Sequence, residues 1–198
     1  MSLIGKFKDN KILEQIKSHD KEAFIRVYDT NVSDIYRFIY FKIGHKDEAH
    51  DLTSAVFLKA WNHIQTNSLE SAKTLRALLY KVARNVIIDY YRERSNRQPL
   101  SLDDEANPID IADESQDQAV QADQSADLEL IRKKLPLLKE EYREVIIMRF
   151  VNDLSLEEMA DISGKSRGNI RVLLHRALKA LKELVEEEIA DRGSVTQA

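Results

Sequence analysis

Apolar residues recur along this chain at positions three and four apart, the spacing of an amphipathic helix. No stretch alternates apolar and polar residues as a half-buried strand would. Seven segments are expected to be helical, at residues 10–19, 20–44, 45–64, 74–97, 126–135, 139–152 and 155–181. The pattern therefore predicts an all-α protein made of two small helical domains on either side of a polar segment.

The last helical segment has the pattern of a helix-turn-helix. Ser155 can cap a helix, and Glu158 three residues later predicts a capping box. Ala160 is small enough for two helices to cross closely, and Gly164 permits a tight turn at Ser163–Lys165. One side of the second helix is expected to be buried through Ile170, Leu173 or Leu174, Ala177 and Leu181.

The other side of that second helix carries hydrogen-bond donors, namely Arg167, Asn169, Arg171, His175 and Arg176. A recognition helix needs such side chains to contact phosphates and base edges in a DNA major groove. An ordinary helical hairpin with a solvated basic face is the alternative that this pattern leaves open.

Charge is distributed very unevenly along the 198 residues, although the net charge is only −4. Residues 99–131 contain ten acidic and no basic residues, whereas residues 1–98 have an excess of five basic residues. The acidic segment also contains Pro99 and Pro108 and no aromatic residue, a composition that is typical of a flexible linker. It is expected to act as a spacer between two separate modules or, alternatively, as a nucleic-acid mimic that competes for their basic faces.

Composition excludes several classes of protein. With no Cys there are no disulfides or thiolate metal sites, and five Gly with three Pro are few for a β-sandwich or barrel. No apolar run reaches the length of a membrane span, and the first residues lack the apolar segment of a signal peptide. The expectation is a cytoplasmic protein that is not inserted in a membrane.

Three further blocks, together with the helix-turn-helix, resemble those of bacterial extracytoplasmic function (ECF) sigma factors, in the same order. They are Asp47–Trp61, Leu75–Arg92 and Leu138–Phe150. The resemblance implies sigma region 2 at residues 1–97, an acidic linker at 98–125, sigma region 4 at 126–190 and a tail at 191–198. It also implies binding to core RNA polymerase, to promoter DNA as duplex and melted non-template strand, and to an anti-sigma factor by family habit.

By this resemblance, the helix that begins near residue 46 docks on RNA polymerase. The implied contact residues are Asp47, Glu48, Asp51, Leu52, Ser54, Val56 and Phe57. Acidic residues at a helix N-terminus also stabilise the helix dipole, so capping alone can account for the first three. Trp61 is expected to belong to the core rather than to this contact.

The −10 element is assigned to the segment 65–97. Its loop, Gln65–Lys73, lies where family members hold a flipped base, and its helix carries the implied DNA-binding residues Arg76, Lys81, Arg84, Asn85, Asp89, Arg92 and Arg94. Asn85 matches the base-reading asparagine of the family in its Ala-Arg-Asn context. Tyr80 and Tyr90 fall on the apolar side and are expected in the core, whereas Tyr91 is open to either role.

The −35 element is assigned to Arg167, Asn169, Arg171, Val172, His175 and Arg176. Val172 and Leu173 stand where the family usually has Ser and a basic residue, and Ser163 and Lys165 replace apolar turn residues. These departures predict one missing phosphate contact and a weaker −35 interaction.

No catalytic arrangement is visible in the sequence, so the protein is expected not to be an enzyme and to need no cofactor or metal. A DNA-binding regulator of the response-regulator type is the alternative function, because it would share the helix-turn-helix. A helical enzyme with an incidental basic helix is a third class, disfavoured by the missing acid and base residues.

Overall fold

The computed structural model describes residues 12, 14–16, 18, 20–66, 75–97 and 133–195. Across these ranges the regular elements are all helical, which confirms the all-α prediction. The predicted linker and most of the loop at Gln65–Lys73 fall outside the described residues. The two helical domains are in direct contact, which the expectation of two separate modules did not include.

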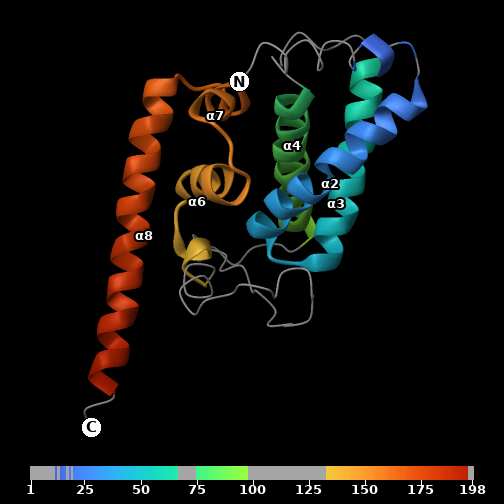
Figure 1. The fold of residues 1–198 in the computed structure, drawn as a ribbon. Coiled ribbons are helices and arrows are strands. Elements are labelled where there is room, and N and C mark those ends of the chain that lie inside the picture. Colours follow the sequence, from blue (N-terminus) through green and yellow to red (C-terminus); the bar gives the residue numbers. More distant parts are fainter. Residues whose placement is uncertain are drawn as a thin grey trace.

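The first domain is a bundle of three long helices, α2 (Lys21–Ile43), α3 (Lys46–Gln65) and α4 (Leu75–Arg97) (Figure 1). Asp20 caps α2 by accepting a hydrogen bond from the amide of Ala23, as an N-cap aspartate does. Gly44 ends α2 in the left-handed conformation, with φ at 78°. Both boundaries agree with the predicted helix from residue 20 to residue 44.

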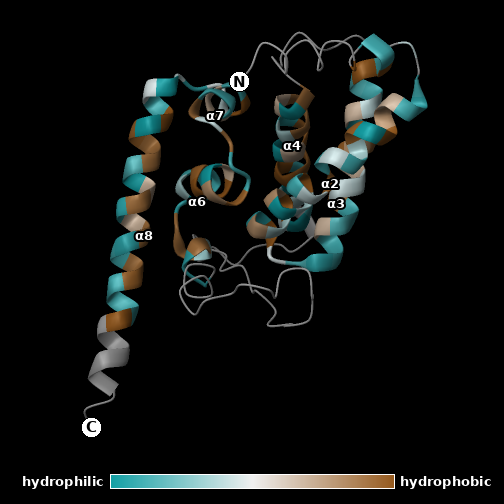
Figure 2. Ribbon diagram, in the orientation of Figure 1, coloured by the Kyte–Doolittle hydropathy of each residue, from teal (hydrophilic) through white to brown (hydrophobic). Residues whose placement is uncertain are grey.

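The core of this bundle is made by apolar side chains at helical spacing on all three helices. Phe38, Ala60 and Leu79 are fully buried, and the ring of Tyr80 packs on Phe38 with a centroid distance of 5.2 Å. Trp61 packs on Phe24 at 4.8 Å, so it belongs to the bundle, as predicted. The apolar sides of the helices face one another in Figure 2.

The second domain begins with a short 3₁₀ turn, η3 (Leu135–Leu137), and continues through α6 (Glu140–Ile146) into a π-helical turn, η4 (Ile147–Val151). The sequence predicted one continuous helix over residues 139–152. Instead the amide of Asn152 donates to the carbonyl of Ile147 five residues earlier. Asp153 then adopts a positive φ of 48°, which turns the chain toward the next helix.

The helix-turn-helix consists of α7 (Leu156–Ser163) and α8 (Arg167–Val195). Ser155 and Glu158 form the predicted capping box, and Gly164 ends α7 with φ at 64°. The turn begins one residue later than predicted, because Ser163 still belongs to α7. Ile170 and Ala177 are fully buried against the domain core, which confirms the predicted inner side of α8.

The domains are arranged so that α6 and α7 face the first domain, while α8 lies on their far side from α4 (Figure 1). Consequently α4 is covered in part by the second domain, whereas α8 is not covered by the first.

Candidate DNA-binding and polymerase-binding surfaces

The outer side of α8 is a solvent-exposed basic surface. The side chains assigned to the −35 element are all exposed there: Arg167, Asn169, Arg171, Val172, His175 and Arg176. Ser166 begins the helix, because its hydroxyl accepts a hydrogen bond from the amide of Asn169 at 3.2 Å. The structure therefore brings together the whole predicted recognition surface.

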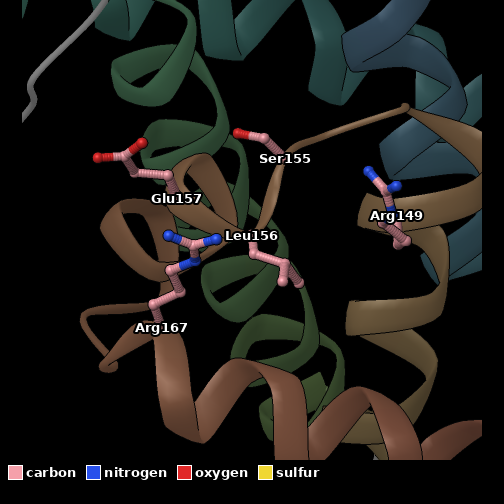
Figure 3. Close-up of a pocket in the computed structure, with 5 residues that line it drawn as sticks. All are labelled: Arg149, Ser155, Leu156, Glu157 and Arg167. Carbon is pink, nitrogen blue, oxygen red and sulfur yellow. The ribbon is translucent and has the colours of Figure 1, made fainter. Parts of the chain in front are cut away.

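An open hollow of about 250 Å³ lies beside the start of α8, lined by Arg149, Ser155, Leu156, Glu157 and Arg167 (Figure 3). Arg149 and Arg167 border the hollow from opposite sides, with the carboxylate of Glu157 and the N-terminal end of α7 between the two elements that carry them. Arg149 is held by a hydrogen bond to the carbonyl of Leu154 at 3.0 Å. The sequence analysis missed Arg149, because it stands on η4, far along the chain from the recognition helix.

The α4 residues assigned to the −10 element divide into two groups. Arg76, Lys81 and Arg84 turn toward the second domain and are paired with its carboxylates. Asn85 and Arg92 are exposed, and Arg94 donates a hydrogen bond to the hydroxyl of Tyr90. Asp89 is engaged by Lys59 at 3.2 Å and Arg92 at 3.8 Å.

The three tyrosines of α4 have different environments. Tyr80 is 1% exposed, and its burial raises its pKa above the ordinary value. Tyr91 is half-buried, donates to the carbonyl of Lys42 at 2.8 Å, and has its pKa raised by burial to about 12. Tyr90 donates to Glu48. Tyr80 and Tyr90 pack with the core, as predicted, and Tyr91 does so as well.

The residues predicted to contact polymerase on α3 lie partly at the surface and partly in the core. Asp47, Asp51 and Ser54 are exposed, and Glu48 and Leu52 are half-buried. Val56 and Phe57 are 0% and 3% exposed and belong to the core, where the ring of Phe57 packs on Phe24 and Tyr28 of α2. Val56 and Phe57 therefore do not lie on the surface of α3 that could contact polymerase.

One exposed apolar residue on α3 was missed by the sequence analysis. Leu58 is 63% exposed and follows Ser54 by four residues, so it continues the face that carries Asp47 and Asp51. Its helical spacing from those residues was the signal that could have identified it.

Metal and membrane features are absent from the parts of the chain described here. Within those ranges no group of three or more His, Asp or Glu side chains is placed to hold a metal ion. Likewise, none of the helices in the same ranges is long and apolar enough to cross a membrane.

The fold and its exposed helix-turn-helix define a DNA-binding protein of transcription. A family model described as Sigma-70 region 2 matches residues 27–97, and one described as Sigma-70, region 4 matches residues 128–181. Together these two ranges cover more than half of the chain. The chain belongs to the sigma-70 family and, by its relatives, to the ECF sigma factors within it.

Curated relatives agree with this assignment. The chain is 28% identical over 179 residues to the ECF RNA polymerase sigma factor BldN of Streptomyces coelicolor, covering 90% of this chain and 66% of BldN. It is 29% identical over 184 residues to the ECF RNA polymerase sigma factor SigW of Bacillus subtilis, covering 89% of this chain and 96% of SigW.

Solved structures show the same fold. CnrH, solved in complex with the cytosolic domain of CnrY, has a TM-score of 0.65 at 20% identity, over 90% of this chain and 97% of that one. The sigma factor RpoE, solved with the anti-sigma factor NepR from Bartonella quintana, has a TM-score of 0.63 at 25% identity, over 82% and 96%.

The protein is therefore a sigma factor that directs promoter-specific transcription initiation with RNA polymerase. Its family consists of initiation factors that are not enzymes. The response-regulator alternative is not supported, because the match extends over the first domain as well as the helix-turn-helix.

Proposed function

We propose that the two basic helices divide promoter recognition between them. In this proposal α8 reads the duplex −35 element through Arg167, Asn169, Arg171 and Arg176, with Val172 and His175 beside them. Arg149 adds a phosphate contact from η4, because its guanidinium lies in the same hollow as Arg167.

The −10 element falls to α4 in the same proposal. Asn85 reads a base of the melted non-template strand, and Arg92 and Arg94 track its backbone together with Arg76, Lys81 and Arg84. This role of α4 is supported by the row of basic side chains along that helix and by the exposed amide of Asn85 next to them.

Core RNA polymerase binds the exposed face of α3 in this proposal. That face presents Asp47, Asp51, Ser54 and Leu58, and it mixes carboxylates with one exposed apolar side chain. The protein acts by binding and not by catalysis, in the cytoplasm where promoter DNA is transcribed. An anti-sigma factor is a further proposed partner, since RpoE was solved in complex with one.

The observation that carries this proposal is the exposed basic surface of α8 built on a capped helix-turn-helix. In vitro transcription with bacterial core polymerase tests it directly, followed by genome-wide mapping of start sites. The proposal predicts specific transcripts that depend on the protein and share −35 and −10 elements. Transcription that is unaffected by its addition would contradict the proposal.

A matched pair of variants separates the −35 role from a general loss of charge. Arg171→Ala should reduce transcription from promoters with a −35 element, whereas Lys179→Ala removes one charge from an exposed position farther along α8. Equal effects of the two variants would mean that only the net charge matters.

A further inference from the structure

Val172 is an apolar residue on the surface of the proposed recognition helix. Its side chain is 51% exposed, although the two residues that follow it, Leu173 and Leu174, are half-buried and pack against the core. Three consecutive apolar residues of α8 therefore have different environments. Packing within the chain accounts for Leu173 and Leu174, but it does not account for Val172.

The position of Val172 is central among the side chains assigned to the −35 element. Residues three and four apart share one face of a helix, so Val172 is adjacent to Asn169 and Arg176, which are both exposed. Val172 also falls in the second turn of α8, and the N-terminal part of a recognition helix is the part that contacts base edges. Two other exposed apolar residues of α8, Leu178 and Ile189, lie farther along the helix.

Gly168, one turn before Val172, leaves room for a close approach to this side chain. Gly168 is part of α8, and a Cβ added there would meet the hydroxyl oxygen of Ser166 at 3.8 Å, an ordinary van der Waals distance. Neither the backbone conformation nor a close contact among the described residues requires glycine, which costs a helix about 1 kcal/mol relative to alanine. Helical side chains lean toward the N-terminus, so the isopropyl group of Val172 lies over the bare turn at Gly168. A base pair can therefore approach that isopropyl group without meeting a side chain at position 168.

The chemistry of valine limits what Val172 can recognise. Its side chain has no hydrogen-bond donor or acceptor, so it binds neither a phosphate oxygen nor the polar atoms of a base edge. The apolar group that distinguishes one base from the others in the major groove is the C5-methyl group of thymine. An exposed isopropyl group at the centre of a recognition surface is therefore matched by that methyl group.

We infer that Val172 is a specificity-determining residue, whose isopropyl group packs on the C5-methyl group of one thymine in the −35 element. This inference rests on the proposed role of α8 in reading the −35 duplex. The element then contains an A·T pair, in one orientation, at the position that Val172 meets. Asn169 and Arg176 supply polar contacts on either side of this apolar one.

The inference adds to what the sequence predicted for Val172. The sequence predicted one missing phosphate contact and a weaker −35 interaction. An apolar contact with a base takes the place of that phosphate contact and provides discrimination between bases. Burial of one methyl group corresponds to about fourfold in affinity at most, or about 0.8 kcal/mol.

Deoxyuridine tests the inference, because it differs from thymidine in the base only by the missing C5-methyl group. The holoenzyme, assembled from the full chain and bacterial core polymerase, is bound at fixed salt to a labelled promoter duplex identified by the start-site mapping. Each thymine of the −35 element, on either strand, is replaced singly by deoxyuridine. One replacement should lower the affinity of wild type about threefold, whereas the same replacement should change the affinity of Val172→Ala by less than about 1.3-fold.

Leu178→Ala is the matched control, because it truncates another exposed apolar side chain of α8 outside the residues assigned to the −35 element. This control should keep the wild-type loss of about threefold at the same thymine. Since Val172 is exposed, its truncation leaves the core intact, and Val172→Ala should unfold at the wild-type urea midpoint.

Two results would overturn the inference: no thymine of the −35 element whose methyl group affects wild-type binding, or an equal loss at that thymine in Val172→Ala. Failure of the inference is distinguishable from failure of the proposed function. If α8 reads the −35 element through its polar side chains alone, replacing the whole element still lowers binding. A holoenzyme that is indifferent to that replacement would contradict the proposed function as well.

Discussion

The two basic helices, α4 and α8, differ in what meets their cations. On α4, Arg76, Lys81 and Arg84 are paired with carboxylates of the second domain, and Arg76 also pairs with Asp34 of α2. On α8, Arg171 and Arg176 are exposed, and no ion pair to either is present within the described residues. Three cations of α4 are therefore covered by the second domain, whereas the cations of α8 are open to solvent.

This difference concerns which basic side chains DNA can reach. The surface of α8 that we propose reads duplex DNA is available while the domains are closed, because it lies on the far side of α6 and α7 (Figure 1). Of the cations proposed for the melted strand, Arg76, Lys81 and Arg84 are covered by the second domain, whereas Arg92 and Arg94 are exposed. The number of basic residues on a helix therefore does not show whether those residues are accessible to DNA.

Arg84→Ala should have the largest effect on stability. The variant removes a charge-assisted pair with Glu144 and a hydrogen bond to Ile162, which should cost about 2 kcal/mol. Arg176→Ala on the open helix should change stability by less than about 0.5 kcal/mol. Urea unfolding followed by circular dichroism measures both, and equal losses would remove the contrast between the helices.

Asn85→Ala tests an exposed residue of α4, in contrast to the covered cations of the same helix. Asn85 is exposed beside the covered cations, so its loss should not disturb the domain contact. If it reads a base of the melted strand, open-complex formation should fall about tenfold, while core-polymerase binding is retained. Permanganate footprinting checks the first expectation and a polymerase pull-down the second. Normal melting would rule out the role given to Asn85.

Arg171→Ala tests the open helix. Loss of one phosphate contact should weaken duplex binding by about 1 kcal/mol and reduce the slope of log affinity against log salt by about one. Fluorescence anisotropy with a promoter duplex at several salt concentrations measures both quantities. An unchanged slope would mean that Arg171 does not neutralise a phosphate.

The smallest effect concerns pH and the pair between Glu140 and Lys42. Partial burial would raise the pKa of Glu140, but Lys42, together with Arg143 and Arg84, outweighs this and lowers the pKa below its ordinary value of 4.5. A lowered pKa in the folded protein means that the stabilisation is present above pH 4.5 and is lost as the pH falls through the folded pKa.

Because Glu140 is more than half exposed, this stabilisation should amount to a few tenths of a kcal/mol. Glu140→Gln should remove that part of the decline in stability toward acid. Urea midpoints measured across the acid range compare the variant with wild type. Identical pH profiles would show that Glu140 does not contribute.

Local features of the fold could be predicted from the sequence because neighbouring residues determine them. The capping box at Ser155, the cap at Asp20 and the positive φ of Gly164 each depend on a few adjacent residues. The exposed face of α8 followed from its 3.6-residue periodicity. The π-helical turn at η4 was not predicted, because the apolar spacing over residues 139–152 is that of one continuous helix.

Long-range features of the candidate site could not be predicted in the same way. Val56 and Phe57 were assigned to a surface by resemblance, but tertiary packing places them in the core. Arg76 and Glu158 are 82 residues apart, so no spacing rule connects them. The sequence showed only that the first domain has an excess of basic residues, and that excess is in part neutralised by the second domain.

The central claim is that the second domain covers three cations of α4 and leaves α8 open to duplex DNA. Because the chain has no Cys, spin labels can be attached at Asn62→Cys on α3 and Glu187→Cys on α8, and their separation measured in solution. The account predicts one narrow distance distribution for the free protein, which does not change when a duplex with the −35 element is bound. A broad distribution, or one that shifts when the duplex is bound, would contradict it.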